Sequence, residues 1–357
     1  MLLNPGPVTL TPRVRAALAR PDLCHREPEF AALTQAIHRQ LAAVYADSEH
    51  HAVVTLTGSG SAAVEAMLTT LVPPGGGVLV CCNGVYGERM ASMLERAGRR
   101  VTRVEHAWTD ALDLGRIDAA LAADPGLGHV AAVHHETTTG RLNDLDGLAA
   151  VCRARGRGLL LDAVSSFGAE RIDFAGWPLA GVAATANKCL HGVPGAAFVL
   201  AERAALEAAA GQATTLYLDL HAYWRSQRDG FSPFTQSTHA HVAFREALEE
   251  FAEAGGWPAR HAAYTALATQ LRDGLAALGV QMLLEPADCA SALTAFHLPD
   301  GLGYAELHDR LRAAGFVIYA GQGALAARVF RLANMGALSA ADLDRLLAEC
   351  AGILAGE

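Results

Sequence analysis

The stretch HAVVTLTGSGSAAVEAMLTTL, residues 51–71, joins a strand-like run to a helix-like run through a turn of small residues. His51–Thr57 is apolar and rich in β-branched side chains, which predicts a buried strand. Ser61–Leu71 has the length and composition of a helix. The stretch therefore predicts one strand–helix unit of an α/β fold.

The same alternation continues along the chain to about residue 200. Further short strands are expected at 78–82, 101–105, 129–134, 158–162 and 196–200, and helices such as 87–97 lie between them. Continuous apolar strands that alternate with helices indicate a mostly parallel sheet with helices on both faces. Ligands of such folds bind at the carboxyl ends of the strands, so we expect the functional site there.

A second, smaller unit is expected after residue 254. The chain is loop-like over FSPFTQST (231–238) and helical over 240–254, and Gly255-Gly256-Trp257-Pro258 then marks a boundary. Beyond it, the pattern predicts helices at 260–278, 304–314 and 340–354 and strands at 281–284, 293–298, 316–319 and 329–332. We expect an N-terminal segment, 1–20, that packs with the small domain, a large domain, 21–254, and a small α+β C-terminal domain, 255–357.

The composition excludes several classes of protein. Hydrophobic residues make up 52% of the 357 residues and charged residues 18%, which is typical of a globular chain with a large core. The net charge of −9 argues against binding of nucleic acid. No apolar run approaches the roughly 18–20 residues of a membrane helix, and the start MLLNPGPVTL lacks the basic segment of a signal peptide. Seven scattered cysteines without CxxC or zinc spacing indicate reduced thiols, so we expect a cytoplasmic protein.

The chain contains a single lysine, Lys188, among its 28 lysines and arginines. Lysine differs from arginine in that it can lose its proton and become a nucleophilic amine. Lys188 lies in the polar segment ANKCLHGVPG, 186–195, which predicts a loop beside the sheet. A Schiff-base lysine needs such an amine, with its pKa lowered from about 10.4 by burial or by a nearby cation. The alternative is a surface lysine that escaped a codon bias toward arginine.

Two strand ends supply candidate ligand-binding residues. Ser59, Gly60 and Ser61 at the start of a predicted helix would let a phosphate approach the free N–H groups and the positive end of the helix dipole. The alternative there is an ordinary capped turn. Asp162 ends an apolar run, LLLDAV, and would point its carboxylate into the ligand crevice, as pyridoxal phosphate requires to keep its pyridine nitrogen protonated. The alternative for Asp162 is a cap on the following turn.

Arg331 stands alone in the apolar strand-like segment VFRLA. A buried guanidinium needs an anionic partner, which would be either a substrate carboxylate or an acid of the protein. The pairs His50-His51 and His134-His135 do not predict a metal site, because neighbouring side chains on a strand point to opposite faces.

These motifs together resemble those of the class V aminotransferases of fold type I. The similar segments extend over nearly the whole chain, and they are GSGSAAVEA, NGVYGERM, HHETTTGRLN, LLLDAVSSFGA, ATANKCLHGVPG and VFRLANMG. The resemblance implies pyridoxal phosphate as the cofactor, a large α/β domain that binds it, a smaller α+β domain, and a homodimer with shared active sites.

The resemblance also implies roles for individual residues. Lys188 would form the Schiff base with the cofactor and later move a proton, and Asp162 would pair with the pyridine nitrogen. Arg331 would bind the carboxylate of the acceptor. The other cofactor-binding residues would be Ser59, Gly60 and Ser61 at the phosphate, Asn187 beside the lysine, Tyr86 stacked on the ring, Thr137 near its phenolic oxygen, and Thr235 or Thr238 from a second subunit.

Within the class, the segments are most similar to those of the 2-aminoethylphosphonate–pyruvate aminotransferases. This similarity implies amino transfer from 2-aminoethylphosphonate to pyruvate, giving phosphonoacetaldehyde and alanine. Candidates for binding the phosphonate group are His25, Arg26 and Arg89, each with the alternative of a surface or dimer-interface charge.

Two regions depart from the pattern of these enzymes and leave the reaction open. FSPFTQSTH replaces an FTPPTH-like run, and VIYAGQG with FRLANMG replaces the usual YPGK and FRIGNIG forms. The alternatives are an ammonia-lyase that acts on a hydroxylated aminoethylphosphonate, and an aminotransferase for another small donor of the alanine–glyoxylate or serine type. The non-enzymatic alternative is a cofactor-binding protein without turnover, against which Lys188, Asp162 and Arg331 argue.

Overall fold

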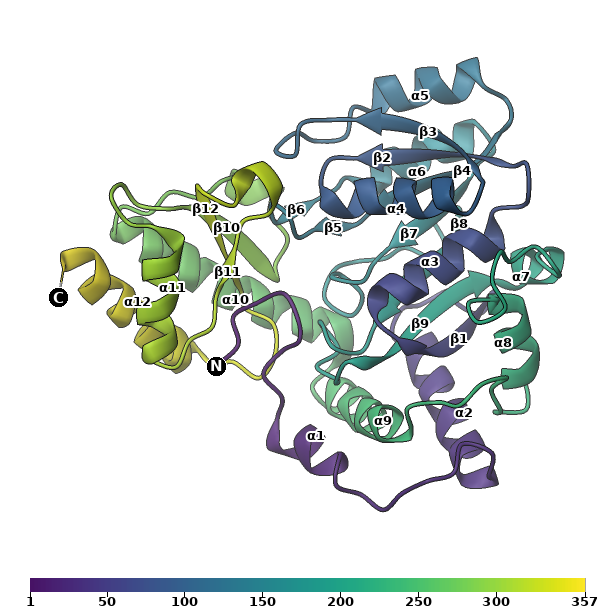
Figure 1. Cartoon of the computed structure of the whole chain (residues 1–357), viewed down its shortest axis with the longest axis horizontal. Coiled ribbons are helices and arrows are strands. Elements are labelled where there is room, and N and C mark those ends of the chain that lie inside the picture. The colour runs from purple at the N-terminus through teal and green to yellow at the C-terminus, as the bar shows by residue number, and fades with distance from the viewer. Residues whose placement is uncertain (357) are drawn as a thin grey trace.

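The computed structural model in Figure 1 describes residues 1–356 and contains a seven-stranded sheet in its larger part. The strand order is β1-β9-β8-β7-β4-β2-β3, and β9 alone runs antiparallel to its neighbours. The strands are β1 His51–Gly58, β2 Gly77–Cys82, β3 Arg100–Glu105, β4 Leu127–Val133, β7 Gly158–Asp162, β8 Leu179–Thr185 and β9 Gly195–Glu202. The mostly parallel α/β sheet is confirmed, and β8 is a strand that the sequence analysis missed.

Helices cover both faces of this sheet (Figure 1). They are α2 Pro28–Ala42, α3 Gly60–Leu71, α4 Val85–Arg96, α5 Leu114–Ala123, α6 Leu145–Ala154, α7 Arg203–Ala208, α8 Leu220–Gln227 and α9 Thr238–Glu253. Leu159 and Leu161 of β7 belong to one buried cluster and Leu160 to another, as alternation along a strand requires. Within residues 1–356, no helix combines the length and the apolar character needed to cross a bilayer.

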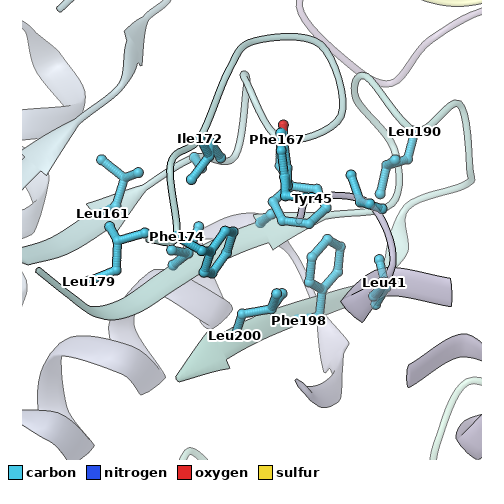
Figure 2. Packing of buried hydrophobic residues seen from close by; sticks show 14 of the residues in the cluster. Leu41, Tyr45, Leu161, Phe167, Ile172, Phe174, Leu179, Leu190, Phe198 and Leu200 are labelled. Carbon is cyan, nitrogen blue, oxygen red and sulfur yellow. The ribbon is translucent and has the colours of Figure 1, made fainter. Parts of the chain in front are cut away.

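Figure 2 shows the part of the core that supports the chain after β7. The ring of Tyr45 packs edge-on against Phe167, with 5.2 Å between the ring centroids. Its hydroxyl donates a hydrogen bond to the carbonyl of Glu170 at 2.7 Å and accepts one from the N–H of Gly168 at 2.8 Å. A buried tyrosine therefore fixes the turn that follows Asp162.

The smaller part contains a three-stranded antiparallel sheet in the order β10-β12-β11. Its strands are β10 Leu293–His297, β11 Tyr319–Ala320 and β12 Val329–Ala333, and its helices are α10 Gly256–Ala277, α11 Tyr304–Ala313 and α12 Ala340–Ala355. The short 3-10 turns are η1 Pro286–Asp288 and η2 Gly323–Leu325, and a two-residue hairpin, β5 His135–Glu136 with β6 Arg141–Leu142, lies in the larger part.

Two local predictions for this part were wrong. The segment 281–284 forms only an isolated bridge, Met282 with Phe296, because the chain enters the 3-10 turn η1 directly afterwards. The strand expected at 316–319 is reduced to β11, since Val317 pairs with Leu2 instead. Helix α10 begins within the segment 255–258, at Gly256, because proline is tolerated in the first turn of a helix.

The first residues of the chain pair with the smaller part. Leu2 forms a bridge with Val317, and Thr9 forms one with Gly336. The N–H of Leu3 donates to the carbonyl of Val317 at 2.9 Å. This segment therefore adds to the edge of the three-stranded region.

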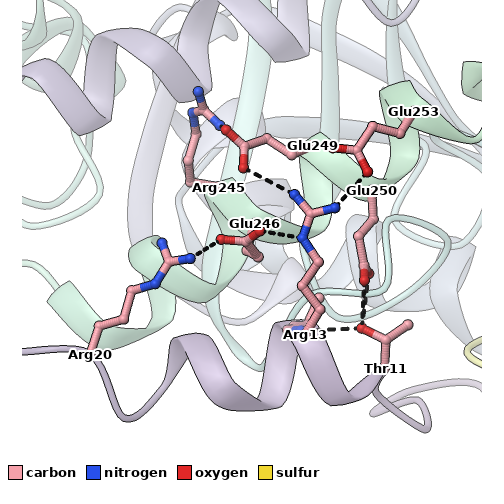
Figure 3. Close-up of polar contacts among 9 residues, drawn as sticks. Thr11, Arg13, Arg20, Arg245, Glu246, Glu249, Glu250 and Glu253 are labelled. Atoms are coloured by element: carbon pink, nitrogen blue, oxygen red, sulfur yellow. Dashed lines mark hydrogen bonds and ion pairs between the residues drawn. The ribbon is translucent and has the colours of Figure 1, made fainter.

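Helix α1, Pro12–Ala17, packs on α9 of the larger part (Figure 3). Arg13 forms ion pairs of 2.5 Å with Glu246 and Glu253, and Arg20 pairs with the same Glu246. The N-terminal segment thus contacts both parts, and the division of the chain at residues 20 and 254 stays a prediction.

Candidate active site

Lys188 lies in the loop between β8 and β9, at the carboxyl end of the parallel strands. Its side chain is 9% exposed, and Nζ donates a hydrogen bond to Oγ of Ser165 at 3.1 Å. Gly6, with φ of +87°, packs on it so closely that a Cβ there would lie 3.0 Å from Cδ and Cε of Lys188. Burial lowers the pKa of Lys188 to about 8, and the positive charges of Arg331 and Arg89 add to the effect. The amine is therefore more readily deprotonated than an exposed lysine, as a nucleophile requires.

Asp162 ends β7, the strand next to β8, so the acid and the lysine lie on neighbouring strand ends. Its Oδ1 accepts a hydrogen bond from the N–H of Val164 at 2.9 Å. Burial raises the pKa of Asp162 to about 6, while the charges of Lys188 and Arg89 act in the opposite direction. Asp162 lines a small cleft together with Ser61, Tyr86 and Arg89.

The turn from β1 into α3 lies on the same side of the sheet. Ser59 is the extended residue before α3, and its hydroxyl makes no capping hydrogen bond. Gly60 packs against the residues after Asp162, since a Cβ at Gly60 would lie 2.7 Å from Cγ1 of Val164. The Oγ of Ser61 accepts a hydrogen bond from Arg89 at 3.3 Å. Free helical N–H groups, hydroxyls and a guanidinium together suit a bound phosphate.

Tyr86 and Arg89 lie one turn apart on α4. The guanidinium carbon of Arg89 lies 4.8 Å from the centroid of the Tyr86 ring, the geometry of a cation–π contact. Both side chains line the cleft beside Asp162, so of the three phosphonate candidates Arg89 is the one that reaches this cleft.

Thr137 and Arg331 meet where the larger and smaller parts of the molecule touch. Thr137 is fully buried, and its Oγ1 has no hydrogen-bond partner within residues 1–356. Its carbonyl accepts a hydrogen bond from Nη1 of Arg331 at 2.8 Å. Arg331 is 3% exposed, and its acceptors among the described residues are the carbonyls of Thr137 and Ala320 and the amide of Gln322. A buried guanidinium held only by neutral oxygens has the capacity to bind an acid.

Two neighbours of Lys188 position its loop. The Oδ1 of Asn187 accepts a hydrogen bond from the hydroxyl of Thr185 at 2.8 Å, which ties the loop to the end of β8. Ser165, missed in the sequence analysis, accepts from Lys188 through its hydroxyl and from His135 through its carbonyl. Its position three residues after Asp162, which ends a predicted strand, could have identified it from the sequence.

Four expected residues lie on or beside the loop 231–238. Thr235 is exposed within this loop, and Thr238 begins α9. Arg26 donates a hydrogen bond to the carbonyl of Ser232 at 3.3 Å, and His25 is its neighbour in sequence.

Glu136 and Gln322 also adjoin the site, and sequence reasoning missed both. Burial raises the pKa of Glu136 to about 7, and its Oε1 accepts hydrogen bonds from the N–H and the hydroxyl of Thr138. Gln322 contacts Thr138 and Arg331. Glu136 stands in HHETTTGRLN and Gln322 in VIYAGQG, but neither segment indicates which of its residues adjoins the site.

The sequence of the chain matches characterised enzymes over most of its length. Residues 13–340 match the family model described as aminotransferase class V. Among its relatives, the 2-aminoethylphosphonate–pyruvate transaminase of Burkholderia thailandensis is 42% identical over 357 residues, which cover 99% of this chain and 96% of that protein. The transaminase of the same name from Pseudomonas putida is 42% identical over 328 residues, covering 90% of this chain and 88% of that protein.

Solved structures give the same result for the fold. An aspartate aminotransferase of subgroup IV from Thermus thermophilus superposes with a TM-score of 0.89 and 28% identity, covering 99% of both chains. The alanine–glyoxylate aminotransferase of Nostoc sp. superposes with a TM-score of 0.90 and 28% identity, covering 99% of this chain and 94% of that one. With the family match extending over more than half of its residues, the chain belongs to the class V aminotransferase family.

Proposed function

We propose that this protein transfers the amino group of 2-aminoethylphosphonate to pyruvate and releases phosphonoacetaldehyde and alanine. The names of the relatives support this pair of substrates. The structural observation that carries the proposal is Arg331, a buried guanidinium bound only to neutral oxygens and close enough to Lys188 to lower the pKa of that lysine. A keto-acid carboxylate would supply the missing anion.

Pyridoxal phosphate is the cofactor of this family, and when bound it supplies an electron sink for a carbanion at the amino-bearing carbon of the substrate. Two observations support its fit here. The unpartnered hydroxyl of Thr137 would meet the phenolic oxygen of the ring. Gly60 brings the N-terminus of α3 close to the segment after Asp162, where a phosphate would be held by Ser59, Gly60 and Ser61.

The catalytic work would fall to Lys188 and Asp162. Lys188 would hold the cofactor through its Nζ until the amine substrate displaces it, and the freed Nζ would then carry a proton away from the amino-bearing carbon. Asp162 is buried beside two cations, and its carboxylate would accept the hydrogen bond of the pyridine N–H and keep that nitrogen protonated. Tyr86 would stack on the ring, and Asn187 would hold the lysine loop in place.

We also propose a homodimer with shared active sites. Thr235 is exposed in the loop 231–238 and Thr238 begins α9, and they would reach the phosphate in the partner subunit. Leu216 is 80% exposed, which suits a surface that a second subunit covers. For the substrate's phosphonate, Arg89 is the candidate from the same subunit.

A cytoplasmic location is proposed from the cysteines. All seven cysteines are unpaired, and five of them are buried. Unpaired thiols are typical of proteins that work in a reducing compartment.

The deciding experiment uses purified protein with the cofactor and 2-aminoethylphosphonate, with and without pyruvate, and measures alanine and ammonia. Alanine that forms only with pyruvate, and that Lys188→Ala abolishes, would establish the proposed reaction. Ammonia released from the hydroxylated substrate without a keto acid would instead assign a lyase. Alanine formation from another small amine alone would assign a different donor.

A further inference from the structure

We propose that Gln322 is a specificity-determining residue for the keto-acid acceptor, and that its side-chain amide is the second group, after Arg331, that binds the acceptor's carboxylate. The proposal rests on the proposed function, because it concerns the half-reaction in which the keto acid is consumed. It assigns a role to a residue of VIYAGQG, a segment that departs from the family pattern.

Arg331 donates three hydrogen bonds to neutral acceptors. Its Nε donates to the carbonyl of Ala320 at 2.8 Å, and Nη1 donates to the carbonyl of Thr137 at 2.8 Å. Both are backbone contacts that fix the guanidinium between the two parts of the molecule. The third contact, from Nη1 to Oε1 of Gln322, is longer at 3.3 Å and comes from a half-buried side chain. It is therefore the contact that an arriving carboxylate would most easily displace.

Either end of the Gln322 amide can form a hydrogen bond at this position. The Oε1 of Gln322 lies 3.2 Å from Oγ1 of Thr138 as well as near Arg331. The Thr138 hydroxyl has one hydrogen, and Oε1 of Glu136 lies closer to it, at 2.6 Å. While that hydrogen is donated to Glu136, the Thr138 oxygen offers the amide only an acceptor. A half turn of the amide would direct an N–H toward Thr138 or toward a carboxylate bound at Arg331.

The loop that carries Gln322 packs against Trp108. Gly323, with φ of +48°, packs so tightly that a Cβ there would lie 2.5 Å from Cη2 of Trp108. The indole Nε1 of Trp108 donates in turn to Glu88 of α4 at 2.8 Å. The loop that carries Gln322 is therefore linked through Trp108 to the helix that carries Tyr86 and Arg89.

The absence of charge on Gln322 affects which keto acid the site prefers. A neutral amide leaves Arg331 as the cation at this end, which matches one carboxylate with one positive charge. A second carboxylate on a longer keto acid would find no cation at Gln322. The site should therefore prefer a monocarboxylate acceptor such as pyruvate to a dicarboxylate such as 2-oxoglutarate.

The experiment separates the two half-reactions of the cofactor-loaded enzyme by the absorption of the cofactor. Gln322→Leu should raise the pyruvate concentration for half-maximal rate about tenfold, the usual effect of losing one hydrogen bond to a charged group, and leave the amine half-reaction within about twofold. Gln322→Glu should raise it further, because the new carboxylate would pair with Arg331. Ala324→Ser, on an exposed residue of the same loop, is the matched control.

A second readout does not depend on turnover. Acetate, which contains the carboxylate but has no keto group, should inhibit Gln322→Leu about tenfold more weakly than the native enzyme. Equal changes in both half-reactions, or unchanged pyruvate and acetate values, would overturn the role of Gln322. A native enzyme that forms no alanine would reject the proposed function itself, so the two failures are distinguishable.

Discussion

The Nζ of Lys188 lies 3.1 Å from the hydroxyl oxygen of Ser165, although the two residues are 23 positions apart in the chain. The contact follows from the pairing of β7 with β8, whose carboxyl ends lead into the two segments that carry these residues. The acid that ends β7 and the lysine that follows β8 therefore lie at neighbouring strand ends.

Borohydride reduction in the presence of pyridoxal phosphate should attach the cofactor to one residue, because Lys188 is the only lysine of the chain. Peptide mass spectrometry would locate the label, and Lys188→Ala should remain unlabelled. A label on the terminal amine would reject the assignment.

Asp162→Asn should lower the rate of amino transfer roughly a hundredfold, the usual scale for loss of a preorganised charge. It should also stabilise the cofactor-free protein. Burial raises the pKa of Asp162 to about 6 from an ordinary value of 3.8, so ionisation disfavours the folded state. This cost is absent below about pH 4 and complete above about pH 6, and it amounts to about 3 kcal/mol at most. The advantage of the variant in free energy of unfolding, measured in urea, should grow between these pH values. A constant difference would contradict the buried carboxylate.

Thr137→Val should have opposite effects on the two forms of the protein. Valine has the shape of threonine but removes a buried hydroxyl without a partner, so the cofactor-free form should gain about 1 kcal/mol. The cofactor should bind about tenfold more weakly, because one hydrogen bond is lost. Thermal unfolding and a cofactor titration measure the two effects, and unchanged cofactor affinity would place the hydroxyl outside the site.

Gly60→Ala should weaken cofactor binding, because the new Cβ would lie 2.7 Å from Val164 and push the start of α3 away. Overpacking of this kind costs about 1–3 kcal/mol, which corresponds to roughly a tenfold loss of affinity or more. Gly128→Ala is the control, since a Cβ there meets no atom within 4 Å. Similar titration curves for both variants would refute the role of Gly60.

Arg331→Ala should raise the KM for pyruvate far more than the KM for the amine, by about tenfold to a hundredfold, as expected when a charged hydrogen bond is lost. Arg331→Lys should recover only part of the loss, because an ammonium lacks the bidentate geometry of guanidinium. Equal effects on both substrates would mean that Arg331 binds the phosphonate or has a structural role.

The sequence predicted the sheet and the two catalytic candidates because both depend on local patterns. Asp162 ends a continuous apolar strand, and Lys188 is the only lysine in the chain. β8 was missed because LAGVAAT is rich in alanine and glycine, which carry little strand preference. The strand expected at 281–284 does not form although its pattern is apolar, because the chain turns at Pro286.

Local sequence patterns do not predict the contacts between distant segments. Gln322 lies in a loop and contacts Arg331 of β12 and Thr138 of the larger part of the molecule. No spacing in the sequence predicts either contact. Ser165 adjoins Asp162 in the chain, but its hydrogen bond to Lys188 depends on which strands are neighbours.

The first residues of the chain link Lys188 to the strand that carries Arg331. Ala333, two residues beyond Arg331 on β12, donates its N–H to the carbonyl of Leu3 at 2.7 Å. Three residues later, the backbone of Gly6 rests on the side chain of Lys188. The stretch 3–6 is therefore in contact with both β12 and the lysine. Because the charge of Arg331 also lowers the pKa of Lys188, an acid bound at Arg331 should raise the proton affinity of Lys188, and by thermodynamic reciprocity the protonation of Lys188 should raise the affinity for the acid to the same extent.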